Sequence, residues 1–330
     1  METQQDEKTL VKSIVPSALA HAATAVVESL KINSISEEAC RGRKVVVKRR
    51  NGHSAQLAEM ANLYFRWSDI PIRFRARPDD WRRWEIGCFR LLNGDRFRAF
   101  ACDSSTVRLD KVPGNSLWNH MERGTLTCSM LEAAAEELRR AHRFFSPEFN
   151  GPWSHGDATT PNFIYNEETG RARLIDFEIV HLKTLPAIFR HADDLLVFLL
   201  DMVGMVEDEQ WLPFALAFLN AYGDAEVIAE LRRRIVVPTG LASIWWGVRT
   251  NFAGATKVTA RLGRLRHALR SFQLRRPARS AAATRQARRA SSICQVTKAG
   301  MPRPISRARA TSERASAPSP GMPSRLPTSR

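Results

Sequence analysis

The segment from Trp153 to Glu178, WSHGDATTPNFIYNEETGRARLIDFE, constrains the fold of this 330-residue chain more than any other stretch. Two short apolar runs, Phe163–Tyr165 and Ala172–Ile175, flank a cluster of turn residues, which is the pattern of a β-hairpin. The hairpin is expected to bring together polar side chains that are far apart in sequence. They lie on the loop before it and directly after it: Asp157, Asn162 and Asp176.

These three side chains suit phosphoryl transfer from a nucleotide. A loop aspartate, here Asp157, orients and deprotonates a hydroxyl group. Asn162, five residues later, returns to the same place to hold a metal ion, and Asp176 follows the next strand and holds the metal that bridges the phosphates. A surface hairpin with solvated acids is the alternative interpretation, and the complete set with its strands favours the site.

At these residues the chain resembles the protein-kinase-like superfamily, and within it the small-molecule branch: aminoglycoside and choline phosphotransferases and lipopolysaccharide sugar kinases. The resemblance is carried by His155-Gly156-Asp157, Asn162 and Asp176-Phe177-Glu178, and it extends over roughly residues 40–205. It implies that Asp157 is the catalytic base, that Asn162 and Asp176 are Mg²⁺ ligands, and that ATP is the phosphoryl donor.

The resemblance implies an α+β, two-lobed protein-kinase-like fold with a small β-rich N-lobe and a larger helical C-lobe. Four segments are expected. They are an N-terminal helical extension (1–30), the nucleotide-binding N-lobe (31–112), the C-lobe with the catalytic loop, metal and acceptor site (113–272), and a disordered basic C-terminal tail (273–330).

In the expected N-lobe, the β-branched run Lys44–Arg50 predicts a strand. The resemblance implies a strand lysine that contacts the nucleotide phosphates. Lys48 is preferred for this role because it ends the apolar run, and Lys44, interpreted as a solvated residue at the start of the strand, is the alternative. Such a lysine needs an acidic partner. Glu85, on a helix-like stretch that ends before Asn93-Gly94, is preferred over Glu59.

Two further segments have expected roles, one assigned by its position in the chain and one by its apolar periodicity. The connector between the lobes follows a predicted strand, and the resemblance places the adenine against the backbone of Asp110, Lys111 and Val112. An amphipathic helix is predicted over Ser129–Phe145, and it should deliver the catalytic loop. His142 on this helix is interpreted as packed rather than as a ligand.

Two residues near the loop are interpreted as supports. Asp194 begins an apolar helix, and in similar kinases an aspartate here accepts hydrogen bonds from the catalytic-loop backbone; a helix N-terminus also favours an acid there. His155 titrates near neutrality by type, but at this spacing we expect it to pack under the loop.

The chain departs from the kinase pattern in two ways. No Gly-x-Gly-x-x-Gly precedes Lys48, and only Gly42 is available for a tight turn. Gly156 stands where protein kinases have an arginine that pairs with a phosphorylated activation loop, and no Ala-Pro-Glu follows. Control by activation-loop phosphorylation is therefore not expected.

The net charge of +16 belongs mostly to the tail. Residues 274–330 hold twelve Arg, one Lys and one Glu, a charge of +12, which leaves +4 for the rest. No aromatic residue follows Phe272, so the tail cannot bury a core. It is either a disordered extension, which allows contact with an anionic membrane surface, or the product of a GC-rich gene read out of frame.

Five scattered cysteines without a Cys-x-x-Cys pair fit a reducing cytosol, and no apolar stretch is long enough to span a membrane. A cytoplasmic monomer is expected, and nucleic acid is not expected as a partner. The sequence predicts an ATP- and Mg²⁺-dependent kinase whose acceptor is a small-molecule hydroxyl, a sugar or amino sugar by analogy, including one of lipopolysaccharide. Helices after Asp194, with Trp245, Trp246 and Arg249, are expected to line the acceptor site. A pseudokinase that serves as a binding scaffold and an atypical Ser/Thr protein kinase are the alternatives.

Overall fold

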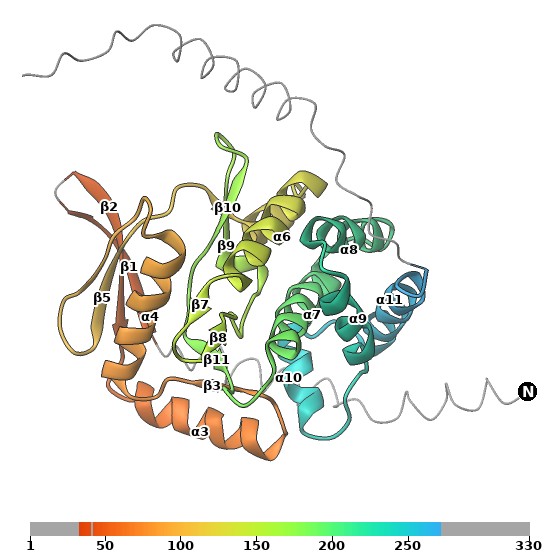
Figure 1. Ribbon diagram of the computed structural model, residues 1–330, viewed down its shortest axis with the longest axis horizontal. Coiled ribbons are helices and arrows are strands. Elements are labelled where there is room, and N and C mark those ends of the chain that lie inside the picture. The colour runs from red at the N-terminus through yellow and green to blue at the C-terminus, as the bar shows by residue number, and fades with distance from the viewer. Residues whose placement is uncertain (1–32, 41, 272–330) are drawn as a thin grey trace, which may run out of the picture. The chain divides into compact units, whose positions relative to one another are not determined.

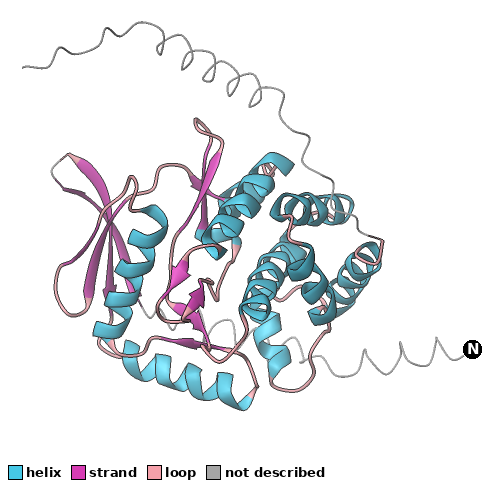
Figure 2. Ribbon diagram, viewed as in Figure 1, coloured by secondary structure: helices cyan, strands magenta, loops and turns pink. Residues whose placement is uncertain are grey.

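The computed structural model describes residues 33–40 and 42–271, which combine helices and strands in an α+β fold (Figures 1 and 2). The predicted N-terminal helix in residues 1–30 and the predicted disordered tail in residues 273–330 lie outside the described residues. Among the helices of residues 33–271 that are described, none has the length and apolar content needed to cross a membrane.

The first half of the chain builds an antiparallel sheet in the order β1-β2-β5-β4. Its strands are β1 (Asn33–Cys40), β2 (Arg43–Arg50), β5 (Thr106–Asp110) and β4 (Ala99–Ala101). β2 lies inside the sheet and matches the predicted strand. Val45 and Val47 are buried, as the alternation of a strand requires, and Lys48 is buried beside them at 4% exposure.

Helix α4 (Pro78–Asn93) packs on this sheet and contains the predicted helix-like stretch around Glu85. Its start is fixed by Pro78 at the first helical position and by two acids in the first turn, which favour the helix N-terminus. Its buried face includes Trp81, Phe89 and Leu92, and Glu85 lies on the same face. The helix ends at Asn93, where the Asn93-Gly94 turn was predicted.

Between β2 and α4 the chain forms helix α3 (Ser54–Trp67) and strand β3 (Ile72–Phe74). β3 does not join the first sheet. It pairs antiparallel with β11 (Ile179–His181), the strand that begins immediately after Glu178. A second, smaller apolar cluster forms here around Phe65, Ile72 and Ile179. This pairing places α3 next to the segment that carries Asp176.

The predicted hairpin is confirmed as β9 (Phe163–Asn166) and β10 (Arg171–Leu174), joined through Gly170 in a left-handed conformation. A short strand, β6 (Asn115–Ser116), pairs with β9. The hairpin contacts both α4 and α6 (Figure 1). A second, two-residue pairing joins β7 (Phe145–Ser146) to β8 (Gly151–Pro152).

The second half of the chain is mainly helical. Its helices are α5 (Leu117–Glu122), α6 (Cys128–His142), α7 (Ala187–Met205), α8 (Asp208–Tyr222), α9 (Ala225–Arg234), α10 (Ala242–Arg249) and α11 (Ala255–Ala268), with a 3-10 turn at Thr160–Asn162. α7 lies in the main core, and most of its residues are buried.

Helix α6 confirms the predicted amphipathic helix but differs at its C-terminal end. The side chain of Thr127 accepts a hydrogen bond from the Met130 amide and caps the start. The helix stops at His142, so the prediction that Phe145 continues its apolar face is wrong. Phe145 instead begins β7 and is 60% exposed, because the chain turns there to form the β7–β8 pair.

Candidate active site

A buried ion cluster joins three distant segments of the chain. The ammonium group of Lys48 on β2 lies 2.7 Å from a carboxylate oxygen of Glu85 on α4 and 2.9 Å from Asp176, just after β10. Burial alone would lower the pKa of Lys48, but Asp176 and Glu85 together hold it above its usual value. Lys48 is therefore a fixed positive charge at neutral pH.

The preference for Glu85 over Glu59 as the lysine partner is confirmed. Glu85 is fully buried, and its second carboxylate oxygen accepts a hydrogen bond from the Phe177 amide at 2.9 Å. This bond ties α4 to the segment that carries Asp176. Glu59 is exposed on α3, and Lys44, the alternative lysine, is exposed at the start of β2.

Asp176 has an unusual backbone conformation, with φ at +62°. Aspartate tolerates this left-handed region better than most residues, and non-glycine residues in it cluster at functional sites. The turn sends Phe177 into the core, where its ring meets those of Trp153 and His155. The carboxylate of Asp176 points the other way and is 30% exposed.

The loop at His155–Asp157 is held by a buried carboxylate on α7. Asp194 accepts hydrogen bonds from the amides of His155 and Gly156, both at 2.8 Å, and from His142 Nε2 at 3.0 Å. Burial alone would raise the pKa of Asp194, but His181 and the bond from His142 hold it well below its usual value. The predicted supporting role of Asp194 is confirmed.

Gly156 and His155 complete this support. Gly156 has φ at +88°, and a Cβ atom there would lie only 3.1 Å from the backbone of Ile179, so any other residue would be strained at this position. His155 is buried, and its Nε2 donates to the carbonyl of Ile175 at the end of β10. Burial lowers the pKa of His155, which keeps it neutral as a packing residue. The interpretation of His155 as a support is therefore confirmed.

A second buried carboxylate on α7 holds the other end of the loop. Asp201 accepts a hydrogen bond from the Thr160 amide at 2.8 Å and another from the Thr160 hydroxyl. Its other oxygen accepts from the side chain of Asn251 at 3.1 Å. Asp201 lies seven residues after Asp194, two turns along the same face of α7, so one helix fixes both ends of the loop that carries Asp157.

Asp157 is partly exposed and differs from both supporting aspartates. The contact to its carboxylate is a long one, from the Asn162 side-chain amide at 3.5 Å. Burial raises the pKa of Asp157 to about 7, against the pull of Arg249. A carboxylate that receives one long hydrogen bond within the described residues, and whose pKa is raised to about 7, suits proton transfer better than structural support.

Arg249 reaches the loop from the end of α10. One of its terminal nitrogens donates to the Gly156 carbonyl at 3.0 Å, and the other lies 3.6 Å from Asp193. Its guanidinium group also lies over the ring of Trp245, 5.2 Å from the ring centre. Arg249 therefore fixes the backbone beside Asp157 and contributes positive charge there.

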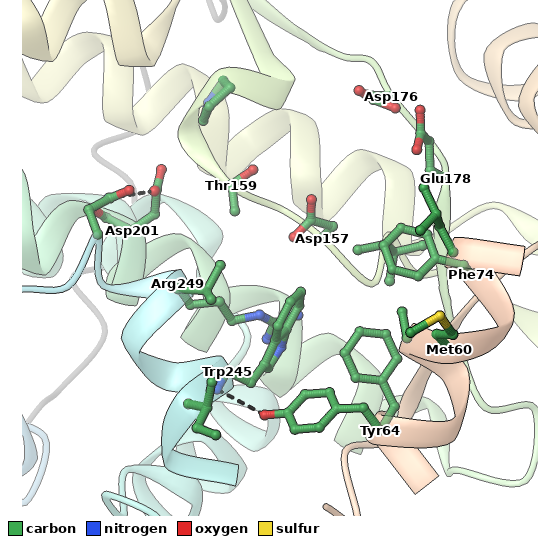
Figure 3. Close-up of a pocket in the computed structure, with 18 of the residues that line it drawn as sticks. Met60, Tyr64, Phe74, Asp157, Thr159, Asp176, Glu178, Asp201, Trp245 and Arg249 are labelled. Carbon is green, nitrogen blue, oxygen red and sulfur yellow. Dashed lines mark hydrogen bonds between the residues drawn. The ribbon is translucent and has the colours of Figure 1, made fainter. Parts of the chain in front are cut away.

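A cavity of about 710 Å³ opens in front of Asp157 and Asp176 (Figure 3). Its acidic side carries Asp157, Asp176, Glu178 and Asp201, and burial raises the pKa of Glu178 to about 8 with a further push from Asp176. Trp245 and Arg249 line it, as predicted for the acceptor site. Trp246 does not line it and packs against the main core instead.

Sequence reasoning missed a large part of this cavity. Five residues of α3 line it, although α3 was considered only as the origin of a rival glutamate: Leu57, Met60, Ala61, Tyr64 and Phe65. The apolar spacing of α3 is that of a helix, but nothing local signals that β3 pairs with β11 and brings α3 here. Asp201, which looks like an interruption of an apolar run, was also missed.

The predicted adenine segment lies apart from this cavity. Asp110 ends β5, Lys111 and Val112 follow it, and none of the three lines the cavity. The carboxylate of Asp110 accepts from the Arg98 amide and from Arg43, and the Lys111 amide donates to the carbonyl of Lys44 at 2.9 Å. Among the described residues, the Val112 amide has no hydrogen-bond partner.

The residues present fit a magnesium ion shared with phosphates. The side-chain amide of Asn162 donates to the Asp157 carbonyl at 2.8 Å and to the Thr159 hydroxyl, which leaves its oxygen without a partner among the described residues. One oxygen of Asp176 accepts from Lys48, and the other has no hydrogen-bond partner within residues 33–40 and 42–271. Mg²⁺ is usually held by one or two protein oxygens together with phosphates and water. Within the described ranges, no cluster of three His, Cys, Asp or Glu side chains is placed to hold a metal ion.

These contacts have the arrangement that the resemblance to the protein-kinase-like superfamily implied: a strand lysine, its helix glutamate, a loop aspartate and a metal-type aspartate. No family model and no curated protein matches the chain. Solved structures similar to it include an ethanolamine kinase from Plasmodium vivax, at 8% identity and a TM-score of 0.40, covering 71% of this chain and 78% of that chain. Another is the complex of Rv3197 with erythromycin from Mycobacterium tuberculosis, at 15% identity and a TM-score of 0.33, covering 71% of each chain.

Proposed function

We propose that this protein is an ATP- and Mg²⁺-dependent phosphotransferase that moves the γ-phosphoryl group to a hydroxyl of a small molecule. The observation that supports this best is the buried Lys48, held at 2.7 Å and 2.9 Å between Glu85 and Asp176. Asp176 lines the same cavity as Asp157. The proposed metal-type carboxylate and the proposed base thus line one cavity, and the fixed cation contacts that carboxylate, as phosphoryl transfer requires.

On the nucleotide side, Lys48 would contact the phosphates with its ammonium group while Glu85 keeps it in place. The oxygens of Asn162 and Asp176 would hold Mg²⁺, which when bound neutralises charge on the phosphates. The adenine would lie against the segment Asp110–Val112, where the Val112 amide, which has no partner among the described residues, would be a donor. The N-lobe of the proposed kinase then corresponds to residues 31–112, and the C-lobe to residues 113–272.

On the acceptor side, Asp157 would accept the proton of the acceptor hydroxyl while the hydroxyl oxygen forms a bond to the γ-phosphorus. The bond from that phosphorus to the β–γ bridging oxygen breaks, and ADP leaves with the electron pair. A carboxyl whose pKa is raised to about 7 by burial exchanges a proton readily near neutral pH. Asp194 and Asp201 would keep the loop in position, so that catalysis is mainly positioning and charge neutralisation.

Two expectations from the sequence belong to this proposal. The chain between Glu178 and α7 is short, which leaves no room for a long activation loop and favours a small-molecule acceptor over a peptide. The expected sugar or amino sugar rests on analogy between families alone. The pseudokinase alternative is favoured by one observation, which is that the β1–β2 turn offers Gly42 and no glycine-rich loop.

The test is the substitution Asp157→Asn in the full chain, assayed by Mg·ATP turnover with water and with a panel of alcohols as acceptors. We expect turnover to fall by roughly 10²- to 10⁴-fold, the range for loss of a general base, with ATP binding retained. Glu59→Gln, at an exposed acid outside the ion cluster, is the matched control and should change nothing. Full turnover in Asp157→Asn would overturn the proposal.

A further inference from the structure

We propose that the acceptor is a largely apolar alcohol, with one reactive hydroxyl on an apolar body, rather than a sugar or amino sugar. This inference rests on the proposed phosphotransferase function and names the substrate class of the same cavity. It is drawn from the wall that faces the carboxylates. That wall is built mainly by α3 and α10, with neighbouring strand residues, and no acidic residue on either helix lines the cavity.

The wall is apolar and aromatic over most of its surface. It is built by residues of α3, by neighbouring strand residues and by α10: Leu57, Met60, Ala61, Tyr64, Phe65, Phe74, Ile179, Ile244, Trp245 and Val248. The ring of Phe65 contacts Trp245 edge-on, with centroids 4.9 Å apart, and stacks on Phe74 at 5.8 Å. Figure 3 shows Asp157, Asp176 and Glu178 on one side of the cavity and Met60, Tyr64 and Trp245 on the other.

The polar groups near this wall are already engaged. The hydroxyl of Tyr64 donates to the Leu241 carbonyl at 2.8 Å and accepts from the Trp245 amide at 3.1 Å. Asn251 donates to Asp201. Two nitrogens, Trp245 Nε1 and Arg249 Nε, have no partner in the part of the chain that the structure describes, but both are shielded from solvent. The wall therefore offers no accessible group for the additional hydroxyls or amines of a sugar.

This lack of partners on the wall opposite the carboxylates favours an apolar substrate class. A hydroxyl buried without a hydrogen bond is expected to lower affinity by roughly five- to a hundred-fold, and a sugar would bring several. An apolar body instead gains affinity from every surface that it removes from water. A volume of about 710 Å³ is in the range of cavities that enclose a drug-sized molecule, so the body should be larger than that of a short alcohol.

The first experiment measures binding without chemistry. Saturation-transfer NMR on the full chain uses 2-naphthaleneethanol and decan-1-ol as apolar probes, and glucosamine and kanamycin as polar ones. We expect the apolar probes to bind, and the polar ones to show at least ten-fold weaker binding. Tighter binding of glucosamine or kanamycin would overturn the inference.

Two variants locate the binding. Ile244→Asp places a charge on the wall, and Ala61→Phe fills the cavity without charge; each should weaken 2-naphthaleneethanol binding by ten-fold or more. Val236→Asp, at a residue that is 57% exposed and does not line the cavity, is the matched control. Unchanged binding in both folded wall variants would place the probe elsewhere and also overturn the inference.

Failure of the inference can be distinguished from failure of the proposed function. Thermal stabilisation of the wild-type chain by Mg·ATP reports the nucleotide site alone. Apolar binding without any response to Mg·ATP would leave the ligand class intact and remove the kinase proposal. A response to Mg·ATP, combined with phosphorylation of glucosamine faster than of either apolar alcohol, would leave the kinase and remove the inference.

Discussion

Asparagine substitutions at Asp194 and Asp157 should have very different effects on stability, although both should reduce turnover. Asp194 is fully buried, and every group around its carboxylate is a donor: two amides at 2.8 Å and His142 Nε2 at 3.0 Å. In Asp194→Asn one oxygen becomes an NH₂ group that faces donors. At least one charge-assisted hydrogen bond is lost, and a buried donor is left unsatisfied.

The magnitude follows from these contacts. Loss of a hydrogen bond to a charged group costs about 1.5–3 kcal/mol, and an unsatisfied buried group about 1–3 kcal/mol. We therefore expect Asp194→Asn to lower the free energy of unfolding by about 3–5 kcal/mol, or the melting temperature by roughly 10 °C. Asp157 receives one long contact, at 3.5 Å, and burial already disfavours its charge. Asp157→Asn should change stability by less than about 1 kcal/mol.

The assay is urea unfolding of both full-length variants, followed by far-UV circular dichroism at pH 7. Since each variant should lose turnover, activity cannot separate the two roles, and stability does. The reasoning would be refuted if Asp194→Asn unfolded within 1 kcal/mol of the wild type, or if Asp157→Asn were the less stable of the pair.

Two further predictions concern charge. Glu85→Gln breaks a buried ion pair, so it should weaken Mg·ATP binding at least ten-fold and destabilise the fold by about 3 kcal/mol. Glu59→Gln, at an exposed residue, should do neither. Isothermal titration measures the binding, and urea unfolding measures the stability. Burial and the stacked His142 lower the pKa of His191 to about 3. Between pH 6.5 and 3 this residue is therefore protonated in the unfolded chain but neutral in the folded chain, and the stability of the fold decreases as the pH falls. His191→Asn should reduce the slope of unfolding free energy against pH by up to about 1.4 kcal/mol per unit in that window, and equal slopes would contradict the assignment.

Features with a local signature could be predicted from the sequence. The β9–β10 hairpin has apolar runs and turn residues within a dozen positions, and β2 has a β-branched run that ends at Lys48. Glu85 was preferred because a helix period and a following turn surround it. In each case the signal and the structure that it specifies lie within one short segment, where propensity and periodicity are informative.

Features created by distant contacts could not be predicted in the same way. β3 has three residues, and its partner β11 lies more than a hundred positions later, so no local pattern shows that α3 borders the site. Asp201 finds its donors on Thr160 and Asn251, neither of which is adjacent to it in the sequence. Without that folded context, a carboxylate inside an apolar helix looks like a defect.

Sequence alone also could not show which of two neighbouring helix residues faces the cavity. Trp245 and Trp246 were both expected at the acceptor site, but successive positions on a helix point about 100° apart, so only one faces the cavity. The sequence does not say which, because α10 has apolar residues on two sides. Similarly, the segment near Val112 would recognise the adenine through its backbone groups, and backbone groups leave no side-chain signature in a sequence.

The central claim is that Lys48, Asp157 and Asp176 form a metal-dependent nucleotide site, and thermal unfolding of the full chain with ATP and Mg²⁺, separately and together, tests it most directly. At a hundred times the dissociation constant, binding adds about 2.7 kcal/mol of stability. We predict a rise in melting temperature only when both are present, and none in Asp176→Asn. An unchanged melting temperature in the folded wild type, or an equal rise without Mg²⁺, would contradict the claim.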